Sequence, residues 1–439
     1  MSTSMSRTKN LIRYVAPTIL SSCCFFLFTI IDGIFVGHGV GTDALGAVNL
    51  VMPFVMVVNA LLMMTTVGGV TVAAIRLGRN DSEGACDAFM HSALGTLAIT
   101  VILSAAGTFL AGPLSRMLGA GDTFYAMVKD YIFWYSLFII PSGFSTNLQG
   151  FCRNDGSPVL VSAAVIAGTA FNIFGDWLLV FPLGMGLKGA AIATGISQTL
   201  TLLIVLSHFI RKKGALRVKR FRPNGAMYRK IIVRGLPEAV AQFSTPVSTF
   251  CMNTILISQI GDIAVNAFSI IAYVASFSVA VFYGTAQGLQ PLFGNCYGAK
   301  QEKDLKFYFR AGMLISLCGS VLITVLLYFV GGGICSLFGA DEKTLQFTVA
   351  HMPQYAWGFI IMALNTIVSS YFYSTKRSRQ AIVINVLRSF ILNSLVIVLV
   401  PFLFGAQTVW YTFGIYESLV FLVGIILLKF SERHGAVYR

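Results

Sequence analysis

Long apolar runs alternate with short polar segments along the whole chain. A membrane-spanning helix needs about 20 mostly apolar residues, and twelve stretches reach that length between breaks that carry Gly, Asp, Asn and Lys. The pattern predicts helices over residues 11–37, 44–76, 88–112, 124–150, 158–182, 189–210, 231–259, 264–296, 307–330, 344–373, 380–403 and 408–429. We therefore expect an all-α integral membrane protein with twelve transmembrane helices. An even number places both termini on one side of the membrane.

Composition supports the membrane assignment. Only 11% of the residues are charged and 56% are hydrophobic, whereas a soluble protein carries about 25% charged residues. The net charge of +14 would suggest nucleic acid in a soluble protein, but here it fits the loops of a membrane protein, and we expect no nucleic-acid partner. The eight cysteines form no CxxC pair and lie mostly in apolar runs, so we interpret them as small buried hydrophobes.

The distribution of positive charge fixes the orientation. With both termini inside, the inner segments hold 26 of the 31 Lys and Arg residues, the outer segments hold four, and Arg388 lies within a span. Because cytoplasmic loops collect Lys and Arg, this asymmetry predicts cytoplasmic termini in the cell inner (plasma) membrane. One connection holds ten of these residues beside the expected anionic lipid surface: Arg211, Lys212, Lys213, Arg217, Lys219, Arg220, Arg222, Arg229, Lys230 and Arg234.

The chain repeats itself at an offset of 220 residues. Without a gap, the shift superposes many small or special residues, among them Pro17 on Pro237, Thr29 on Thr249, Gly41 on Gly261, Gly68 on Gly288, Gly78 on Gly298 and Tyr135 on Tyr355. We predict two six-helix lobes, residues 1–210 and 231–439, joined by a basic cytoplasmic linker over 211–230. Six is an even number, so the halves are parallel repeats related by a pseudo-twofold axis along the membrane normal.

Two prolines hold equivalent positions in the first helix of each half. Pro17 and Pro237 fall early in these helices and should kink or loosen them, because proline removes a helical hydrogen bond. Proline is commoner in membrane helices than elsewhere, so packing alone would also explain single positions. For the matched pair we favour a hinge that can move.

Asp32 is an acid inside an apolar run, with no Lys or Arg between Arg13 and Arg76. A charged side chain at the centre of a bilayer costs roughly 2.5–3.5 kcal/mol on insertion scales, so such an acid is a functional candidate by default. A second one, Asp176, shares a helix face with Asn172, four residues earlier. Under the repeat, Asp32 aligns with Met252. Matching Pro182 to Pro401 places Leu395 opposite Asp176, so neither carboxylate belongs to the duplicated scaffold.

We predict that Asp32, Asn172, Asp176 and Thr194 converge in the first lobe. Such a cluster supplies hard oxygen ligands for a small cation such as Na+, or two carboxylates that share a proton. The alternative is structural, with each acid capping a helix or meeting interfacial water near the outer surface.

Other polar groups within the spans are weaker candidates. Glu417 faces Gln198 under the repeat and could serve substrate or protons, whereas Arg388 needs an acidic partner that the sequence does not name. Tyr131 opens the fourth helix, where an interfacial aromatic belt is the default and a stacking surface for a flat cation is the alternative. Glu238, directly after Pro237, either complements a helix dipole or takes part in function. We expect a substrate cavity formed by Tyr131, Gln149, Gln198, Gln287 and Glu417.

The sequence carries no motif for ATP or for hydrolytic chemistry. There is no Gly-x4-Gly-Lys-Ser/Thr, no Gly-x-Ser-x-Gly and no His-Glu-x-x-His. We therefore expect a transporter rather than an enzyme, without a cofactor and driven by an ion gradient.

Several short motifs, in their order and spacing, resemble the MATE (multidrug and toxic compound extrusion) family, and the resemblance covers nearly the whole chain. They are Asp32-Gly-Ile-Phe-Val-Gly37, Ala44-Leu-Gly-Ala47, Gly78-Arg-Asn-Asp81 and Gly189-Ala-Ala-Ile-Ala-Thr194. The resemblance implies a proton- or sodium-coupled antiporter that exports amphipathic, often cationic, drugs by rocker-switch alternating access, as a monomer. In the prokaryotic branch it implies a coupling site at the residues matching Asp32, Asn172, Asp176 and Thr194. The seventh helix lacks the deep acid of another branch: no acid lies between Ala239 and Asn253.

Three other functions are weighed against efflux. A flippase for a lipid-linked precursor would need a cavity rich in Arg and Lys to hold pyrophosphate, but only Arg388 lies in the middle of a predicted span. A membrane-embedded enzyme acting on lipid would need Asp-rich motifs on a cytoplasmic loop with a metal, whereas the inner loops are basic. A channel would not need paired lobes, and its flux would not depend on a coupling gradient.

Overall fold

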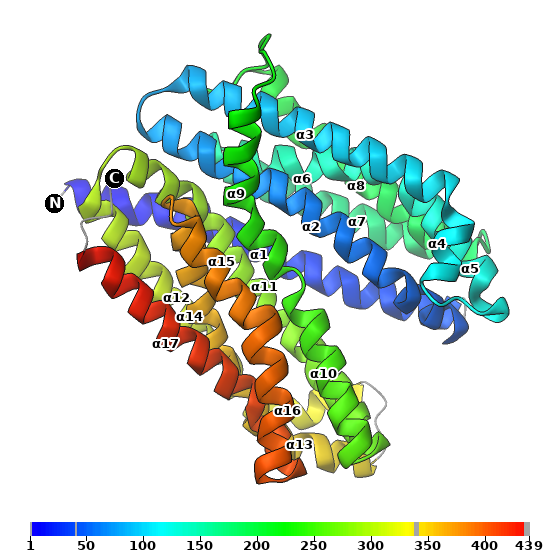
Figure 1. Cartoon of the computed structure of the whole chain (residues 1–439). Helices are drawn as coiled ribbons and strands as arrows, with labels where there is room; N and C mark the ends of the chain where they lie inside the picture. Colours follow the sequence, from blue (N-terminus) through cyan, green and yellow to red (C-terminus); the bar gives the residue numbers. More distant parts are fainter. Residues whose placement is uncertain (1, 40–41, 338–341, 434–439) are drawn as a thin grey trace. The chain divides into compact units, whose positions relative to one another are not determined.

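The computed structural model describes residues 2–39, 42–337 and 342–433; at some positions inside these ranges, Asp32 among them, it describes the backbone and not the side chain. All regular secondary structure in these ranges is helical (Figure 1), which confirms the predicted fold class. The first half contains α1 (Ser2–Gly39), α2 (Thr42–Gly78), α3 (Ser82–Phe109), α4 (Ala111–Met117), α5 (Asp122–Leu137), α6 (Ile139–Asn154), α7 (Pro158–Val180) and α8 (Gly186–Ile210). The second half contains α9 (Gly225–Ala241), α10 (Ser244–Gln259), α11 (Asp262–Gly298), α12 (Glu302–Leu337), α13 (Glu342–Ala356), α14 (Gly358–Ser374), α15 (Ser378–Val386), the π-helical turn η1 (Leu387–Ile391), α16 (Leu392–Phe404), the 3-10 turn η2 (Ala406–Tyr411) and α17 (Thr412–Arg433).

Each of the twelve predicted spans coincides with one helix or with an interrupted run of helices. The span over 124–150 divides into α5 and α6, and the span over 231–259 divides into α9 and α10. Pro141 and Pro246 lie in the first turns of α6 and α10, where a missing N–H leaves no intrahelical hydrogen bond unmade. By length and apolarity alone, nine helical stretches of the described residues qualify as membrane spans.

The helices form two compact units. One comprises Ile12–Gly235, here called the N lobe; the other comprises Met1–Leu11 together with Leu236–Arg439, here called the C lobe. Two helices therefore contribute to both units: the first turns of α1 belong to the C lobe, where Arg7 forms an ion pair with Asp304, and the first half of α9 belongs to the N lobe.

The backbone repeats as the sequence does. Two non-glycine residues with a left-handed φ, Asn80 at 59° and Lys300 at 57°, lie 220 residues apart in the turns that follow α2 and α11. Gly156 at 89° and Lys376 at 63° are separated by the same number of residues, in the turns that precede α7 and α15. A left-handed φ is uncommon outside glycine. The duplication therefore preserved the turn geometry even where the residue type changed.

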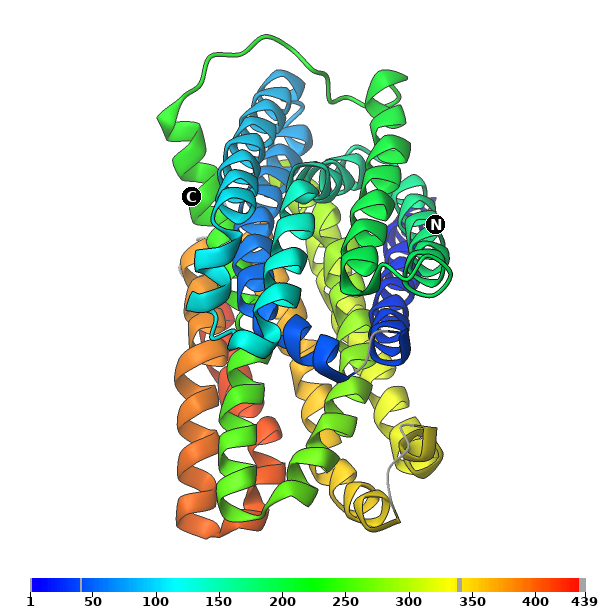
Figure 2. The same cartoon turned by 90° about the vertical axis from the view of Figure 1, so that its right-hand side faces the viewer.

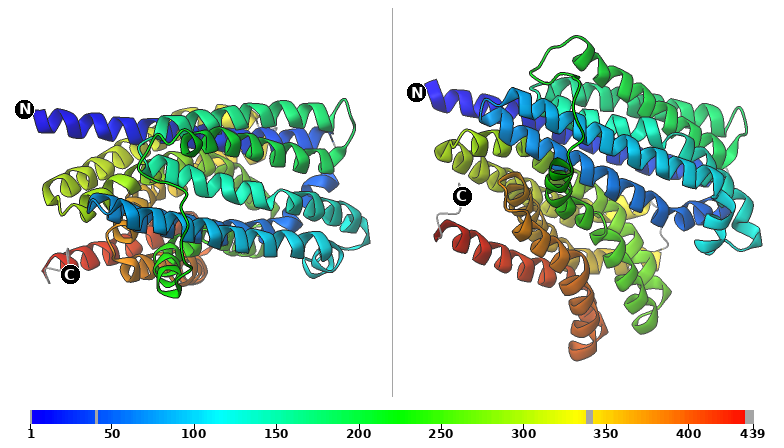
Figure 3. Two further views of the ribbon diagram at one scale, coloured as in Figure 1. Left: turned by 90° about the horizontal axis from the view of Figure 1, so that it is seen from above. Right: turned by 45° about the horizontal axis from the view of Figure 1, so that its top comes forward.

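In the N lobe, α2 and α3 run side by side (Figure 3), and α9 approaches α2 without intervening side chains. A Cβ atom added to Gly235 would lie 1.7 Å from the carbonyl oxygen of Met64, and one added to Gly68 would lie 2.0 Å from that of Ile231. Such backbone contact between membrane helices requires small residues at the crossing. The start of α9 is thereby anchored to the N lobe.

The basic connection between α8 and α9 is an extended segment attached to the N lobe (Figure 2). The buried carboxylate of Asp155 accepts hydrogen bonds from the backbone N–H groups of Ala215 and Leu216, at 2.7 and 3.2 Å, and contacts Nε2 of His208 at 2.9 Å. Further along, the backbone N–H of Asn224 donates to Nε2 of His91 at 3.0 Å. The connection is therefore part of the lobe's packing, and its charges belong to the N lobe.

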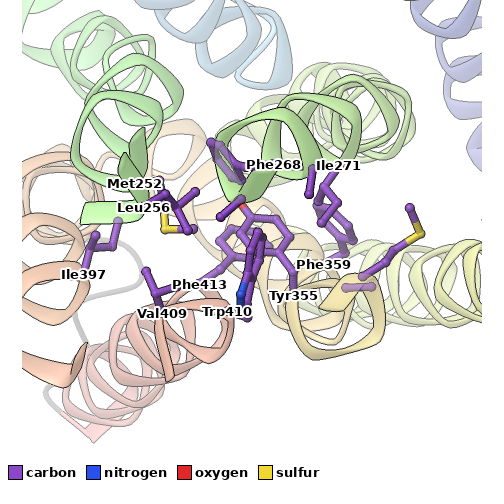
Figure 4. Packing of buried hydrophobic residues seen from close by; sticks show 14 of the residues in the cluster. Met252, Leu256, Phe268, Ile271, Tyr355, Phe359, Ile397, Val409, Trp410 and Phe413 are labelled. Carbon is purple, nitrogen blue, oxygen red and sulfur yellow. The ribbon is translucent and has the colours of Figure 1, made fainter. Parts of the chain in front are cut away.

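The C lobe packs around an aromatic and aliphatic cluster contributed by α10, α11, α13, α14, α16, η2 and α17 (Figure 4). Tyr355 stacks on Phe413 with ring centroids 4.5 Å apart, and Trp410 and Phe359 are fully buried beside them. Met252 lies in the same cluster and is 1% exposed. The position equivalent to Asp32 is therefore core packing in the C lobe.

A row of polar side chains joins the eleventh predicted span to the broken seventh one. Asn385, Ser389 and Asn393 lie four residues apart and donate hydrogen bonds to the carbonyl oxygens of Pro237, Val240 and Ser244, at 2.6, 3.2 and 3.4 Å. These carbonyls flank the break between α9 and α10, and a break in lipid requires internal partners for its backbone. We call these three side chains the polar seam.

The approach of α9 to α2 should not tolerate a methyl group. Gly235→Ala is expected to destabilise the protein by roughly 1–3 kcal/mol, because the added Cβ meets a backbone carbonyl that cannot rotate away. The matched control is Gly225→Ala on the same helix, where a Cβ meets nothing within 4 Å. The measurement is the thermal unfolding midpoint of purified protein in detergent; equal midpoints for the two variants would contradict the proposed contact.

The connection should become accessible to protease when Asp155 is removed. In Asp155→Ala, two backbone N–H groups and His208 lose their acceptor, and local opening should become easier by about 1 kcal/mol or more. Trypsin should then cleave the basic segment roughly five- to tenfold faster. Asp122→Ala, which removes an acid that is 95% exposed, serves as the control. Unchanged cleavage in Asp155→Ala would show that other contacts hold the segment.

Candidate coupling and substrate sites

Asn172 and Asp176 meet inside the N lobe, as their spacing predicts. Both lie on α7, and Asn172 Nδ2 donates to Asp176 Oδ2 at 3.0 Å. The Asp176 side chain is completely buried and Asn172 is 1% exposed. A buried carboxylate is costly unless it is bonded or neutralised, and the Asn172 amide supplies one such bond.

Thr194 lies on the neighbouring helix, α8, at the level of this pair. Ala193 beside it packs against Gly175, where an added Cβ would lie 3.1 Å from the Ala193 Cβ. Thr194 is half-buried. The side chain of Asp32 lies outside the described residues; its backbone belongs to α1. The structure thus describes a hydrogen bond between Asn172 and Asp176 and places Thr194 on the adjacent helix, and the convergence of all four residues stays a prediction.

The available ligands suit a hard cation or a proton. Asp176, Asn172 and Thr194 offer carboxylate, amide and hydroxyl oxygens, the donor types that Na+ and similar ions prefer. Within the described residues there is no group of three His, Cys, Asp or Glu side chains that could hold a transition metal.

The predicted substrate residues of the N lobe lie on three helices. Tyr131 on α5 stacks on Tyr135 with ring centroids 6.2 Å apart and an interplanar angle of 8°. Gln149 on α6 donates to Ser145 at 3.0 Å, and Gln198 on α8 is half-buried. Nearby on α5, Trp134 receives the Lys188 ammonium over its ring, 4.7 Å from the centroid. The aromatic face of α5 therefore already holds one cation of the protein itself.

In the C lobe, Glu417 is the acceptor at the centre of a buried cluster. Arg388 Nε donates to Glu417 Oε1 at 2.7 Å, and Asn365 Nδ2 donates to Glu417 Oε2 at 2.7 Å and to its carbonyl oxygen at 2.8 Å. Glu417 and Asn365 are each 1% exposed, and Arg388 is 7% exposed. Glu417 is therefore the acidic partner of Arg388, which the sequence did not identify. The cluster also leaves both oxygens of the Glu417 carboxylate engaged.

Glu238 lies on α9 within the same lobe, one residue after Pro237 and 7% exposed. Gln242 Nε2 donates to its carboxylate at 3.3 Å, and the charge of Arg388 also acts on it. Gln287, the other predicted substrate residue of this lobe, lies on α11 and is half-buried. The C lobe therefore contains two buried carboxylates around a single guanidinium.

The two predicted hinge prolines differ in their surroundings. The helix α1 continues through Pro17, whose carbonyl oxygen accepts a hydrogen bond from the Ser162 hydroxyl at 2.7 Å. Helix α9 ends four residues after Pro237, whose carbonyl oxygen accepts from Asn385. In each lobe, a side chain from the fifth span holds the carbonyl of the proline in the first. Among the hydrogen bonds of the described residues, the further contacts of the polar seam, from Ser389 and Asn393, belong to the C lobe.

Two features escaped the sequence reasoning. A signal for the first was present: Arg388 sits mid-span and Glu417 is the acid of the next helix, so a buried pair was the simplest solution. For the polar seam, the spacing of Asn385, Ser389 and Asn393 on one helical face was visible. Their acceptors, backbone carbonyls around a break, carry no sequence signal.

Comparison with known proteins gives the family. The family model described as MatE matches residues 17–178 and 237–399, one match in each half of the chain. Among curated relatives, the multidrug export protein MepA of Staphylococcus aureus (strain NCTC 8325) is 21% identical over 430 residues, covering 96% of this chain and 93% of its own. A protein of Shewanella oneidensis named as an FAD transporter is 24% identical over 387 residues, covering 85% of this chain and 83% of its own.

Solved structures agree on the fold. A structure described as MATE in complex with MaL6 superposes with a TM-score of 0.92 at 21% identity, covering 98% of this chain and 97% of that one. A MOP superfamily transporter from Pyrococcus furiosus, whose binding pocket is described as having reverse polarity, superposes with a TM-score of 0.91 at 20% identity, covering 99% and 97%. With the family model matched in both halves, the chain belongs to the MatE family of membrane transporters.

Proposed function

We propose that this protein is a secondary active antiporter that exports amphipathic, often cationic, drugs in exchange for H+ or Na+. The observation that carries the proposal is the buried Asn172–Asp176 pair in a lobe whose fold and family are those of MATE transporters. Its relative MepA is named as a multidrug export protein. The sequence contains no ATP-binding motif, so an ion gradient supplies the energy.

In this proposal Asp32 and Asp176, supported by Asn172 and Thr194, form the coupling site. A buried carboxylate accepts either a proton or a cation, and each removes a negative charge from the lobe interior. Drug binding and ion binding then favour different conformations of the lobe. A ligand shifts such an equilibrium only through its differential affinity for the two states, so loss of the carboxylate removes the coupling.

The substrate is proposed to contact Tyr131, Gln149 and Gln198 of the N lobe, and Gln287 and Glu417 of the C lobe. Stacked aromatic rings bind flat cations, and the Lys188 ammonium over Trp134 shows that α5 presents a ring face to a positive charge. Glutamine amides supply hydrogen bonds that are not specific for one ligand. A promiscuous drug site needs this combination.

The lobes over 1–210 and 231–439, with the linker over 211–230, are proposed to alternate between inward- and outward-open states, with Pro17 and Pro237 as hinges. The protein is proposed to act as a monomer in the cell inner membrane, with both termini cytoplasmic, because the inner segments collect most of the Lys and Arg residues. Besides the drug and the coupling ion, the proposed transport cycle requires only the lipid bilayer as a partner.

Removing either carboxylate should abolish coupling while sparing the fold. Asp176→Asn and Asp32→Asn are expected to lower ethidium efflux from intact cells at least about tenfold, since coupling free energies of 1–3 kcal/mol correspond to 5–150-fold effects. Asp122→Asn, an exposed acid of the same lobe, is the matched control. Normal efflux by Asp176→Asn at equal membrane expression would sink the coupling proposal.

The coupling ion can be identified in proteoliposomes. With a pH gradient and a Na+ gradient imposed separately, one of them alone should drive dye movement, and that movement should vanish in Asp176→Asn. Dye movement that persists without either gradient would indicate a channel or a leak and would contradict antiport.

A further inference from the structure

The guanidinium of Arg388 is only partly used by the protein. An arginine side chain carries five N–H donors, and within the described residues Arg388 makes one hydrogen bond, from Nε to Glu417. Its two terminal nitrogens are not fully buried, and the side chain as a whole is 9% exposed. By contrast, all three side-chain nitrogens of Arg377, in the turn between α14 and α15, are buried from solvent. Four donors of a buried cation are therefore available to a ligand.

The surroundings hold this cation in place. Glu417 is fixed by two hydrogen bonds from Asn365, so it positions the Nε edge of Arg388 and leaves the terminal edge free. Arg388 itself lies in the π-helical turn η1, between α15 and α16. The π-helix is rare, and the single π-helical turns found inside α-helices frequently lie at functional sites. The hydrogen bond from Ser389 to Val240 anchors the same turn to α9.

The charges near Arg388 set what it can bind. Glu417 neutralises it in a close pair, and Glu238 acts on it from α9 without a direct hydrogen bond. Among the described residues, no acidic side chain forms a hydrogen bond or an ion pair with the terminal edge of the guanidinium. A planar fork of donors in a low-dielectric interior then matches a carboxylate or a phosphate group, to which arginine binds through two parallel hydrogen bonds.

We propose that Arg388 binds an acidic group of the transported compound, a carboxylate or a phosphate, and so extends the substrates of this protein from simple cations to zwitterionic and anionic amphiphiles. This rests on the transport function proposed above and names a substrate class for it. Glu417 and Asn365 act as positioning residues, because they orient the guanidinium without taking up its terminal donors.

The test uses two dyes that differ in one group. Rhodamine 110 carries a free carboxylate and rhodamine 123 is its methyl ester, so the ring system and its positive charge are shared. Their transport is measured in proteoliposomes for the wild type, Arg388→Lys and the double variant Arg388→Gln/Glu417→Gln. The double variant removes both charges together, because removing one partner would leave an unpaired buried charge. Arg379→Gln, which removes an exposed arginine from the same lobe, is the control.

The double variant is expected to lower the transport efficiency (kcat/KM) for rhodamine 110 about tenfold more than that for rhodamine 123, the loss typical for a charge-assisted hydrogen bond, because loss of a Glu417 contact affects both dyes alike. Arg388→Lys, which keeps the charge and the pair with Glu417, should lose part of the preference because the ammonium has no fork. A parallel loss for both dyes, or no loss for either, would overturn the inference.

Failure of the proposed function gives a different result. If the wild type moves neither dye under any gradient, the proposed transport function is refuted. Fluorescence anisotropy of dye binding in detergent then tests whether Arg388 binds the acidic group. Tighter binding of rhodamine 110 than of rhodamine 123 that is weakened in Arg388→Lys supports the acidic-group site. Equal affinities of the two dyes for the wild type exclude it. If the double variant does not accumulate, the Arg388→Lys comparison alone decides in the same way.

Discussion

The need to satisfy polar groups without water shapes this molecule more than any other constraint. In the hydrocarbon region a backbone carbonyl or a charge must find its partner within the protein. The C lobe meets this need at the break between α9 and α10, where Asn385, Ser389 and Asn393 donate to three carbonyls. Such a seam makes an interrupted helix possible. It also ties the interruption to the eleventh span, so that the two must move together.

The same constraint explains why the lobes, built on one repeat, carry different chemistry. Where the N lobe has Asp32, the C lobe has Met252 packed in its aromatic core (Figure 4), and where the N lobe has Asp176, the C lobe has Leu395, which is 49% exposed. The C lobe instead buries Glu417 against Arg388. One lobe holds a carboxylate that a small cation or a proton can neutralise, whereas the other holds a carboxylate already neutralised by a fixed guanidinium. A coupling ion would therefore favour the first, and an acidic ligand the second.

The basic connection contributes to the N lobe as well as to topology. Asp155 and His91 fix its backbone to that lobe, and most of its Lys and Arg residues are exposed. The lobe thereby carries positively charged residues on a segment that is fixed to it, and anionic lipid would attract them. In a membrane whose inner leaflet is anionic, that attraction acts on one lobe rather than on a free linker.

The sequence by itself determined the helical class, the twelve spans and the repeat, because membrane helices need long apolar stretches and a duplication leaves a constant offset. It also determined that Asn172 and Asp176 meet, since residues four apart share a helix face. The tertiary structure alone decided the partner of Arg388, the acceptors of the polar seam and the attachment of the connection through Asp155. These contacts join residues 29 to 149 positions apart. Their geometry depends on how helices pack, and no local pattern of residues encodes that.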